Sequence, residues 1–328
     1  MNGSSKRFDT QFEIQRRDFL KGVCGLSVGL VAAQQAGPPA AAPAATEGES
    51  KLPQIPFGRA SLSRLLIGSN PFNPGSHLSV FVNQEMRNYF TSEQKIKTLR
   101  RCEDAGITCW QGSENHYEIY QQFREQGGRL HYISLGSGGP NAASFLKKMV
   151  ELGCLGVAHH GETTDQLFKA GKLDAIRDFL KQVRDTGMQV GISTHMPAVV
   201  DAVESKGWDL DFYMTCVYER HRSAKDLEAL LGHVPIPVGE VYLQSDPPRM
   251  FKAIRQTRRT CLAFKILAAG RLSERKEWVE QAFRQTFAGI KPTDGVIVGI
   301  YDRYSDQPAE NAAYVRRFSS LSGKAESA

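Results

Sequence analysis

Short apolar segments and amphipathic helical segments alternate through most of this 328-residue chain, and this alternation limits the possible folds more than any other feature. Strands that alternate with helices predict right-handed crossovers and a parallel sheet. Eight strand-like units in one domain predict a closed (β/α)8 TIM barrel, which is an α/β fold. The strand-like runs are residues 65–69, 107–111, 130–135, 154–159, 188–194, 210–217, 261–267 and 294–301.

Helix boundaries in the sequence support the barrel. Most strand-like runs follow a helical stretch that ends in Gly, as in 104–106 (DAG) and 185–187 (DTG), and Gly favours the left-handed conformation beyond a last helical turn. Thr91 with Gln94 three residues later is a capping-box pattern, which predicts a helix start. The alternative fold, an open doubly wound sheet, usually carries GxGxxG after its first strand, whereas residues 68–74 are GSNPFNP.

The first 45 residues predict a twin-arginine signal peptide. Residues 15–21 (QRRDFLK) resemble the twin-arginine motif, and they precede an apolar run, 22–33, and an Ala-rich stretch, 36–45. The apolar run is too short to be a stable membrane anchor. We therefore expect the twin-arginine export machinery to be a partner and the mature protein to be periplasmic or extracellular.

The remaining chain predicts one domain with no nucleic-acid partner. We expect a linker and entry segment over 46–60, a barrel over 61–320 and a disordered tail over 321–328. The formal net charge is only +6, and no cluster of Lys and Arg is interleaved with aromatic residues, which argues against nucleic-acid binding. The six cysteines are scattered without a CxxC motif, which predicts mostly buried free thiols.

Polar residues that follow the predicted strands are candidate site residues, because barrel enzymes carry their chemistry on these loops. Together they form a ring of amide, hydroxyl, imidazole and charged groups, which suits a small substrate rich in hydroxyl or carbonyl groups, such as a sugar. The candidate catalytic residues are Lys265, His195 and His160. The candidate substrate-binding residues are Asn70, His77, Gln111, Glu240 and Tyr218.

Lys265 is the strongest catalytic candidate. Strand alternation places Lys265 on the side of Cys261 and Ala263, opposite the bulky residues of the same run, and we expect its side to face the barrel interior. A desolvated lysine has a lowered pKa and can act as a base or form a Schiff base. The structural alternative is a buried lysine paired with a carboxylate such as Asp302 or Glu240.

The histidines are the other titratable candidates. His195 lies at the end of a predicted strand, and only one of the neighbours His159 and His160 can enter the barrel mouth, which we expect to be His160. His77 lies in a long loop that could cover the mouth. His77, His160 and His195 with Glu240 would suffice for a divalent metal, but no HxH or HExxH spacing supports one, so no metal ligand is assigned and a divalent metal stays an open alternative.

Several segments resemble the aldo-keto reductase superfamily. The segments are 57–68, 185–195, 208–213 and the Glu310–Asn311 pair. The resemblance implies a (β/α)8 barrel that reduces carbonyl groups with NADP(H), using Asp, Tyr, Lys and His. Of that set, the His alone has a counterpart in this sequence, as His159 or His160.

Three functions are therefore open. The first is an exported barrel enzyme that performs acid–base or Schiff-base chemistry, of lyase or isomerase type, on a small sugar-like substrate. The alternative is an NADP(H)-dependent aldo-keto reductase with a rearranged proton donor such as Tyr218. The third is a catalytically degenerate barrel that binds a ligand in the periplasm.

Replacement of Arg16 and Arg17 by Lys tests the export signal. Twin-arginine recognition depends on this pair, so we expect the variant precursor to stay inside the cell, while folding is unchanged. Cell fractionation followed by immunoblotting measures the two pools. Mature double variant in the periplasm would show that this stretch is not a twin-arginine signal.

Overall fold

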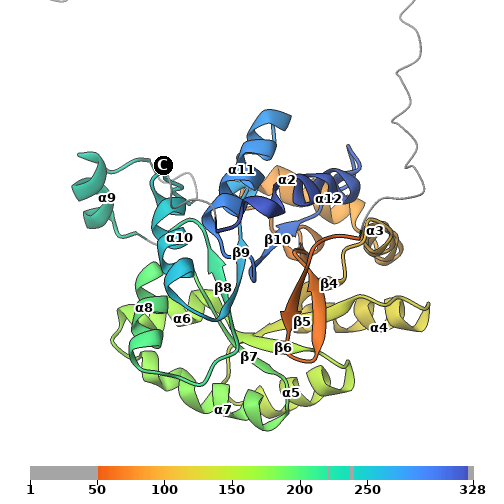
Figure 1. Ribbon diagram of the computed structural model, residues 1–328, viewed down its shortest axis with the longest axis horizontal. Helices are drawn as coiled ribbons and strands as arrows, with labels where there is room; N and C mark the ends of the chain where they lie inside the picture. The colour runs from red at the N-terminus through yellow and green to blue at the C-terminus, as the bar shows by residue number, and fades with distance from the viewer. Residues whose placement is uncertain (1–50, 221, 237–239, 324–328) are drawn as a thin grey trace, which may run out of the picture. The chain divides into compact units, whose positions relative to one another are not determined.

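The predicted TIM barrel is confirmed. The computed structural model describes residues 51–220, 222–236 and 240–323, so the predicted signal peptide over 1–45 lies outside the described residues. Eight parallel strands close in the order β10-β3-β4-β5-β6-β7-β8-β9 (Figure 1). They are β3 (Leu65–Gly68), β4 (Cys109–Ser113), β5 (His131–Gly136), β6 (Gly156–His159), β7 (Gln189–Thr194), β8 (Phe212–Cys216), β9 (Thr260–Phe264) and β10 (Gly295–Gly299). Each overlaps one of the predicted strand-like runs.

Helices surround the barrel strands (Figure 1). The described helices are α2 (Val80–Tyr89), α3 (Ser92–Asp104), α4 (Tyr117–Glu125), α5 (Ala142–Glu151), α6 (Gly161–Lys169), α7 (Arg177–Asp185), α8 (Pro197–Ser205), α9 (Ala224–Leu231), α10 (Asp246–Gln256), α11 (Lys276–Gly289) and α12 (Gln307–Phe318). Short 3-10 helices are η1 (Asn70–Phe72), η2 (Glu114–His116), η3 (Leu173–Ile176), η4 (Ala268–Gly270) and η5 (Ser319–Leu321). No described helix is both long and apolar enough to cross a bilayer.

Three of these helices are additions to the basic strand–helix repeat. α2, α6 and α9 lie in the connections that leave the carboxyl ends of β3, β6 and β8, ahead of the helices that return the chain to the next strand. The carboxyl end of the barrel, which we call the mouth, is therefore built from longer connections than the amino end. Thr91 caps α3 as predicted, since its hydroxyl accepts a hydrogen bond from Gln94 N at 3.2 Å.

Alternation along the strands sorts the apolar side chains into two clusters. One fills the barrel interior and the other packs between the strands and the helices. The interior cluster includes Leu66, Cys109, Ile133, Ala158, Phe212, Met214, Leu262 and Ile297. The outer cluster includes Leu65, Ile67, Trp110, Val190, Tyr213, Cys261, Ala263 and Val296. The five described cysteines are all buried free thiols, as the sequence predicts, and Cys24 lies outside the described residues.

A β-hairpin closes the amino end of the barrel, where the sequence predicted a linker and entry segment over 46–60. β1 (Gln54–Phe57) and β2 (Ala60–Ser63) pair antiparallel, and their buried residues join the interior cluster. The ring of Phe57 lies 4.9 Å from that of Phe212, edge to face. Four-residue strands carry too short an alternation to be recognised, and Pro56 is tolerated because it lies in a hairpin at the edge.

Arg64 joins the first barrel strand to the end of the chain. Its buried guanidinium donates to the carbonyl oxygens of Asp294 (2.8 Å), Ser319 (2.7 Å) and Lys291 (2.9 Å). It also donates to the hydroxyl of Ser322 at 2.8 Å. Ser322 is itself buried, so the predicted tail over 321–328 begins with residues that pack on the barrel, and 324–328 lie outside the described residues.

Replacement of Phe57 by Ala tests whether the hairpin stabilises the barrel by packing into the interior cluster. The change removes a buried aromatic ring that the interior cannot refill, so the free energy of unfolding should fall by about 3 kcal/mol. Urea denaturation followed by circular dichroism measures this difference. The matched control is Phe81→Ala, because Phe81 is 80% exposed and its loss should change stability by less than about 0.5 kcal/mol. If the two changes lowered the free energy of unfolding equally, the hairpin would not contribute to stability through the interior cluster.

Candidate functional site

All eight candidate residues lie at the mouth of the barrel. Asn70 follows β3, Gln111 belongs to β4, His160 follows β6, His195 follows β7, and Lys265 follows β9. The remaining three, His77, Tyr218 and Glu240, come from the longer connections after β3 and β8. The carboxyl ends of parallel strands meet at one end of a barrel, and this brings together residues that are far apart in the sequence.

Lys265 reaches the mouth for a reason that strand alternation did not predict. Leu262 and Phe264 pack on the interior cluster, whereas Cys261 belongs to the outer cluster, so the predicted placement of Lys265 by its side of the strand is wrong. β9 ends at Phe264, and Lys265 adopts a left-handed φ of 58°. The chain therefore leaves the strand at this residue, and alternation no longer governs the direction of its side chain.

The backbone beyond Lys265 is strained. Ala268 and Ala269 also have left-handed φ values, 48° and 52°, in the short helix η4. A left-handed conformation costs a residue other than Gly roughly 1 kcal/mol or more, and such strain is concentrated at functional sites. The strained segment is therefore an independent indication that this part of the mouth is functional.

The Lys265 ammonium is poorly compensated in the folded protein. Burial, together with the nearby cations Arg220 and Arg271, lowers the pKa of Lys265 to about 8, against the opposing effects of Cys216 and Glu162. In the described part of the chain no carboxylate forms an ion pair with its Nζ.

The two carboxylates considered as structural partners of Lys265 bind other cations. Asp302 accepts from Arg101 at 2.5 Å and from the hydroxyl of Thr98 at 2.9 Å. Glu240 forms an ion pair with Arg220. Neither Asp302 nor Glu240 therefore forms the ion pair with Lys265 that a purely structural role would require.

His195 is held by a buried carboxylate that the sequence analysis missed. Asp165, on α6, accepts a hydrogen bond from His195 Nδ1 at 2.8 Å and another from the His195 backbone N at 3.0 Å. Its other oxygen accepts from the hydroxyl of Thr194 at 2.5 Å. Both His195 and Asp165 are buried, so the imidazole has one orientation and Nδ1 carries the proton that Asp165 accepts.

His195 and Lys265 share a neighbour. The His195 ring lies edge to face against the ring of Phe264, with centroids 5.5 Å apart. Lys265 Nζ lies 5.9 Å from the centroid of the same ring. A buried imidazole and a partly buried amine therefore flank one aromatic side chain at the end of β9.

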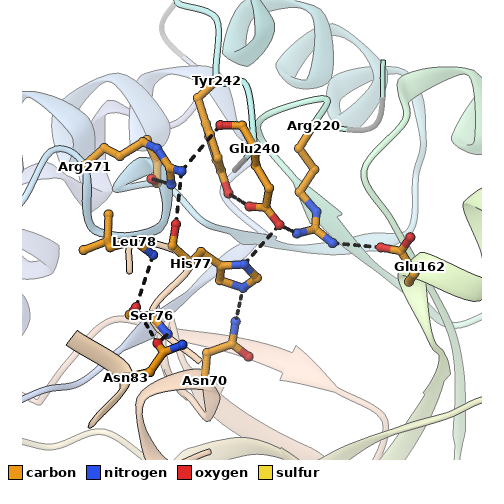
Figure 2. A network of polar contacts seen from close by, with 11 residues as sticks. Asn70, Ser76, His77, Leu78, Asn83, Glu162, Arg220, Glu240, Tyr242 and Arg271 are labelled. Atoms are coloured by element: carbon orange, nitrogen blue, oxygen red, sulfur yellow. Dashed lines mark hydrogen bonds and ion pairs between the residues drawn. The ribbon is translucent and has the colours of Figure 1, made fainter. Parts of the chain in front are cut away.

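The loop after β3 is joined at the mouth to the segments that follow β8 and β9. Figure 2 shows His77 between Asn70 and Glu240, with Arg220 and Arg271 around them. Asn70 Nδ2 donates to His77 Nε2 at 3.0 Å, and His77 Nδ1 donates to a Glu240 oxygen at 3.0 Å. Arg271 Nη2 donates to the carbonyl oxygens of His77 (3.1 Å) and Glu240 (3.4 Å). His77 has a left-handed φ of 57°, so this arrangement holds a strained residue in place.

His77 is neutral in this network. Burial lowers its pKa to about 3, together with the smaller effects of the cations Lys265, Arg220 and Arg271. The carboxylate of Glu240 does not reverse this effect, because its charge is shared with Arg220. Arg220 also binds Glu162 at 2.8 Å, and the second Glu240 oxygen accepts from Tyr242 at 2.5 Å. The neutral ring therefore positions the loop and is a poor proton acceptor.

His160 and His159 point to different environments, as predicted. His159 is buried on the helix side, where its Nδ1 lies 2.7 Å from the hydroxyl of Thr164 and its ring contacts Phe179. His160 is the N-cap of α6, and its charged neighbours are those of the mouth, including Glu162 and Arg220. Burial lowers the pKa of both histidines.

The last two candidates have modest interactions. Gln111 is buried and shares the strand side of Cys109, which faces the interior, and its amide donates to Gly112 O at 2.8 Å. The ring of Tyr218 lies 5.2 Å from that of Tyr242, and burial raises the pKa of Tyr218 to about 12. The Tyr218 phenol therefore stays protonated at neutral pH.

A polar pocket of about 320 Å³ lies beside the network, a volume in the range of small-ligand sites. It is lined by Glu162, Asp165, Gln166, Lys169, Arg220 and Arg222. Within the described residues, no group of three or more His, Cys, Asp or Glu side chains is placed to hold a metal ion.

Five residues of the mouth were missed by the sequence analysis. They are Glu162, Asp165, Arg220, Tyr242 and Arg271. Charged residues of this kind are common on helices and loops, and none belongs to a local motif. Position after a predicted strand could have indicated Arg220, which follows β8 closely, but nothing in the sequence distinguishes Asp165 from other acidic residues on helices.

Comparison with sequence profiles of protein families and with characterised protein sequences finds no match. Solved structures with a similar backbone include glycerol dehydrogenase AKR11B4 from Gluconobacter oxydans, at 12% identity and a TM-score of 0.46 over 80% of this chain and 89% of that chain. A truncated 3-deoxy-D-arabino-heptulosonate 7-phosphate synthase from Thermotoga maritima has 10% identity and a TM-score of 0.48 over 83% and 92%. Similarity this low says nothing about the chemistry of this chain.

Replacement of Lys265 by Met should stabilise the protein in a pH-dependent way. Because the pKa of Lys265 is lowered from 10.5 to about 8, burying its ammonium costs about 3 kcal/mol below pH 8. That cost disappears as the pH rises from 8 to 10.5, since the folded protein releases the proton before the unfolded chain does. The stability gain of the Met variant, measured by urea denaturation, should therefore be largest at pH 7 and smallest above pH 10.

The matched control is Lys291→Met. Lys291 Nζ forms an ion pair with Asp294 at 3.0 Å and donates to Ile254 O at 2.7 Å. Its removal leaves Asp294 buried without that cation, so the control should be destabilised at pH 7. Destabilisation of both variants to the same extent would place Lys265 among the structural lysines.

Proposed function

We propose that this chain is an exported barrel enzyme that uses Lys265 for acid–base or Schiff-base chemistry on a small substrate rich in carbonyl or hydroxyl groups. The observation that carries the proposal is the Lys265 amine, which lies at the mouth without a carboxylate partner in the described chain and with a pKa of about 8. Such an amine is uncharged in about a tenth of molecules at pH 7, far more than for a lysine with an ordinary pKa, and only the uncharged form is a nucleophile or a base. Export is proposed from residues 1–45 alone.

Lys265 would act on a carbonyl group by imine formation. The Nζ lone pair attacks the carbonyl carbon and forms a carbinolamine, which loses its hydroxyl group as water and leaves a protonated imine. The imine draws electrons from the neighbouring carbon, so that a proton or a carbon fragment can depart from it. This chemistry needs a second group that gives and takes protons.

His195 is the proposed proton-transfer group. Asp165 accepts the Nδ1 proton, which leaves Nε2 as the nitrogen that exchanges a proton with the substrate or with the carbinolamine hydroxyl. The buried carboxylate also stabilises the imidazolium when it forms. His160, among the charged residues of the mouth, is a further proposed participant.

The surrounding polar groups favour a substrate with several hydroxyl groups. Amides, carboxylates and guanidinium groups offer both donors and acceptors, and they line the mouth on several sides. The proposed binding residues are Asn70, His77, Gln111, Tyr218 and Glu240, with Arg220 and Glu162 added from the structure. A reductase dependent on NADP(H), or a barrel that binds a ligand without turnover, remains the alternative outcome of the test below.

Trapping with borohydride tests the proposal. We expect wild-type protein incubated with a panel of aldoses and ketoses of three to six carbons to acquire a reduced adduct on the peptide that contains Lys265, as measured by mass spectrometry. Lys265→Met should lose the adduct and at least about 100-fold of any turnover seen without a redox cofactor. Lys291→Met, at the amino end of the barrel, should keep both.

Two outcomes would contradict this function. Full turnover by the folded Met variant would remove Lys265 from the chemistry and leave His195 and His160. Consumption of NADPH by the wild-type protein with carbonyl substrates would instead establish the reductase alternative.

A further inference from the structure

Arg271 is a half-buried cation that contacts no carboxylate in the part of the chain that the structure describes. Its guanidinium donates instead to three backbone carbonyl oxygens, those of Ala268 (3.2 Å), His77 (3.1 Å) and Glu240 (3.4 Å). It also lies over the ring of Tyr242, 4.2 Å from the centroid. These contacts fix the orientation of the guanidinium, and they use Nη1 and Nη2 but leave the Nε–H without an acceptor among the described residues.

Lys265 is a second cation of the mouth that forms no ion pair within the described residues, and Ala268 joins it to Arg271. Ala268 N donates to Lys265 O at 2.8 Å, and Ala268 O accepts from Arg271 Nη1 and from the Arg271 backbone N at 3.3 Å. The two side chains are close enough for the charge of Arg271 to lower the pKa of Lys265. The strained turn after β9 therefore holds two cations close together at the mouth.

The carboxylates nearest to these two cations bind other groups. The Glu240 carboxylate accepts from Arg220, from His77 Nδ1 and from the hydroxyl of Tyr242. The Glu162 carboxylate binds Arg220 at 2.8 Å. Figure 2 shows that Arg271 reaches the backbone oxygen of Glu240, whereas the carboxylate of Glu240 faces Arg220. Neither carboxylate therefore serves as the counter-ion of Arg271.

This part of the mouth lacks one negative charge when Lys265 is protonated. Lys265, Arg220 and Arg271 are three cations, and Glu162 and Glu240 are two anions. A protonated imine on Lys265 carries the same single positive charge as the ammonium, so the difference persists in the proposed chemistry. Cations that are partly removed from water need a counter-ion, and a substrate with one negative charge would supply it.

We propose that Arg271 binds a carboxylate of the substrate, and that the carbonyl group attacked by Lys265 is next to this carboxylate. The substrate class is then a 2-oxo acid with a hydroxylated chain, which is a sugar acid rather than a neutral sugar. Hydrogen bonds from a guanidinium to a carboxylate are charge-assisted, so they are stronger than those to a neutral hydroxyl group. This inference rests on the proposed function for the position of the reacting carbonyl group.

A carboxylate fits this arrangement better than a phosphate group does. A carboxylate brings one negative charge, whereas a phosphate monoester brings about 1.5 to 2 at neutral pH. The larger charge would exceed the one that is missing, since the other cation nearby, Arg222, is bound to Asp246. The remaining anion of the region, Asp165, is bound by His195 and would balance its imidazolium.

Calorimetric titration with three probes of one carbon skeleton tests the carboxylate site. D-Gluconate has the carboxylate and a hydroxyl group in place of the carbonyl, so it binds without forming an imine. D-Glucitol is its neutral counterpart, and D-glucitol 6-phosphate carries a phosphate group instead. We expect wild-type protein to bind D-gluconate about tenfold or more tightly than D-glucitol.

The ratio of the two affinities distinguishes recognition of the carboxylate from a structural role of Arg271. Arg271→Gln should abolish the preference for D-gluconate, whereas Arg271→Lys, which keeps the charge, should retain part of it. If Arg271 only fastened the loop, both variants would weaken the two probes equally and leave the ratio unchanged. The matched control is Arg255→Gln, because Arg255 also donates to a backbone carbonyl oxygen, that of Gly289 at 2.9 Å, but at the amino end of the barrel.

Borohydride trapping separates this inference from the proposed function. The substrates are 2-oxo-D-gluconate and D-fructose, which differ only in a carboxylate in place of the hydroxymethyl group at C1. We expect about tenfold more adduct on the Lys265 peptide with 2-oxo-D-gluconate at equal concentration, and Arg271→Gln should lose this advantage.

Several results would overturn the inference while the proposed function stands. They are equal adduct yields from the two substrates, equal or undetectable binding of D-gluconate and D-glucitol, tighter binding of D-glucitol 6-phosphate than of D-gluconate, and a preference for D-gluconate that survives Arg271→Gln. A preference that depends on Arg271 without any adduct on the Lys265 peptide would instead keep the carboxylate site and remove Lys265 from the chemistry.

Discussion

Closure between the first and last barrel strands is the constraint on which the site depends. β3 and β10 pair over four residues, and the buried Arg64 ties this seam to the end of the chain by donating to three backbone carbonyl groups. Its guanidinium also lies over the ring of Phe287, 4.9 Å from the centroid. Burial lowers the pKa of Arg64 to about 10, so the group remains charged at neutral pH and its hydrogen bonds are charge-assisted. The seam fixes where the strands end, and hence where Asn70 and Lys265 emerge.

The two ends of the barrel differ in how they use backbone conformation. The amino end is filled by the hairpin and the Arg64 network, with apolar packing and satisfied carbonyl groups. At the mouth, His77, Lys265, Ala268 and Ala269 all have left-handed φ values, although none is glycine. Strain of this kind persists only where the surrounding structure holds it, and here the stable amino end and the network around Glu240 supply that support.

The fold was predictable from the sequence because strand and helix periodicities are local, and eight repeated units leave little choice of architecture. Lys265 was expected at the mouth because side chains alternate along a strand. The strand ends at Phe264, one residue before Lys265, so the expected position was reached by an argument that does not apply to this residue. Asp165 could not be predicted as the partner of His195, because the two residues are 30 positions apart and meet only once α6 packs beside β7. The hairpin β1–β2 was missed because its strands are four residues long.

The charges around the mouth bear directly on the protonation of Lys265. The network of Figure 2 holds two cations, Arg220 and Arg271, and two anions, Glu162 and Glu240, and the His77 ring between them is neutral. Glu162 and Glu240 both form ion pairs with Arg220, and Glu162 offsets only part of the cost of the Lys265 ammonium. Burial and the two guanidinium groups lower the pKa of Lys265 to about 8 and so raise its neutral fraction, and the neutral amine is the form that attacks a carbonyl carbon. The network that joins the segments after β3 and β8 therefore also raises the neutral fraction of Lys265, on which the proposed chemistry depends.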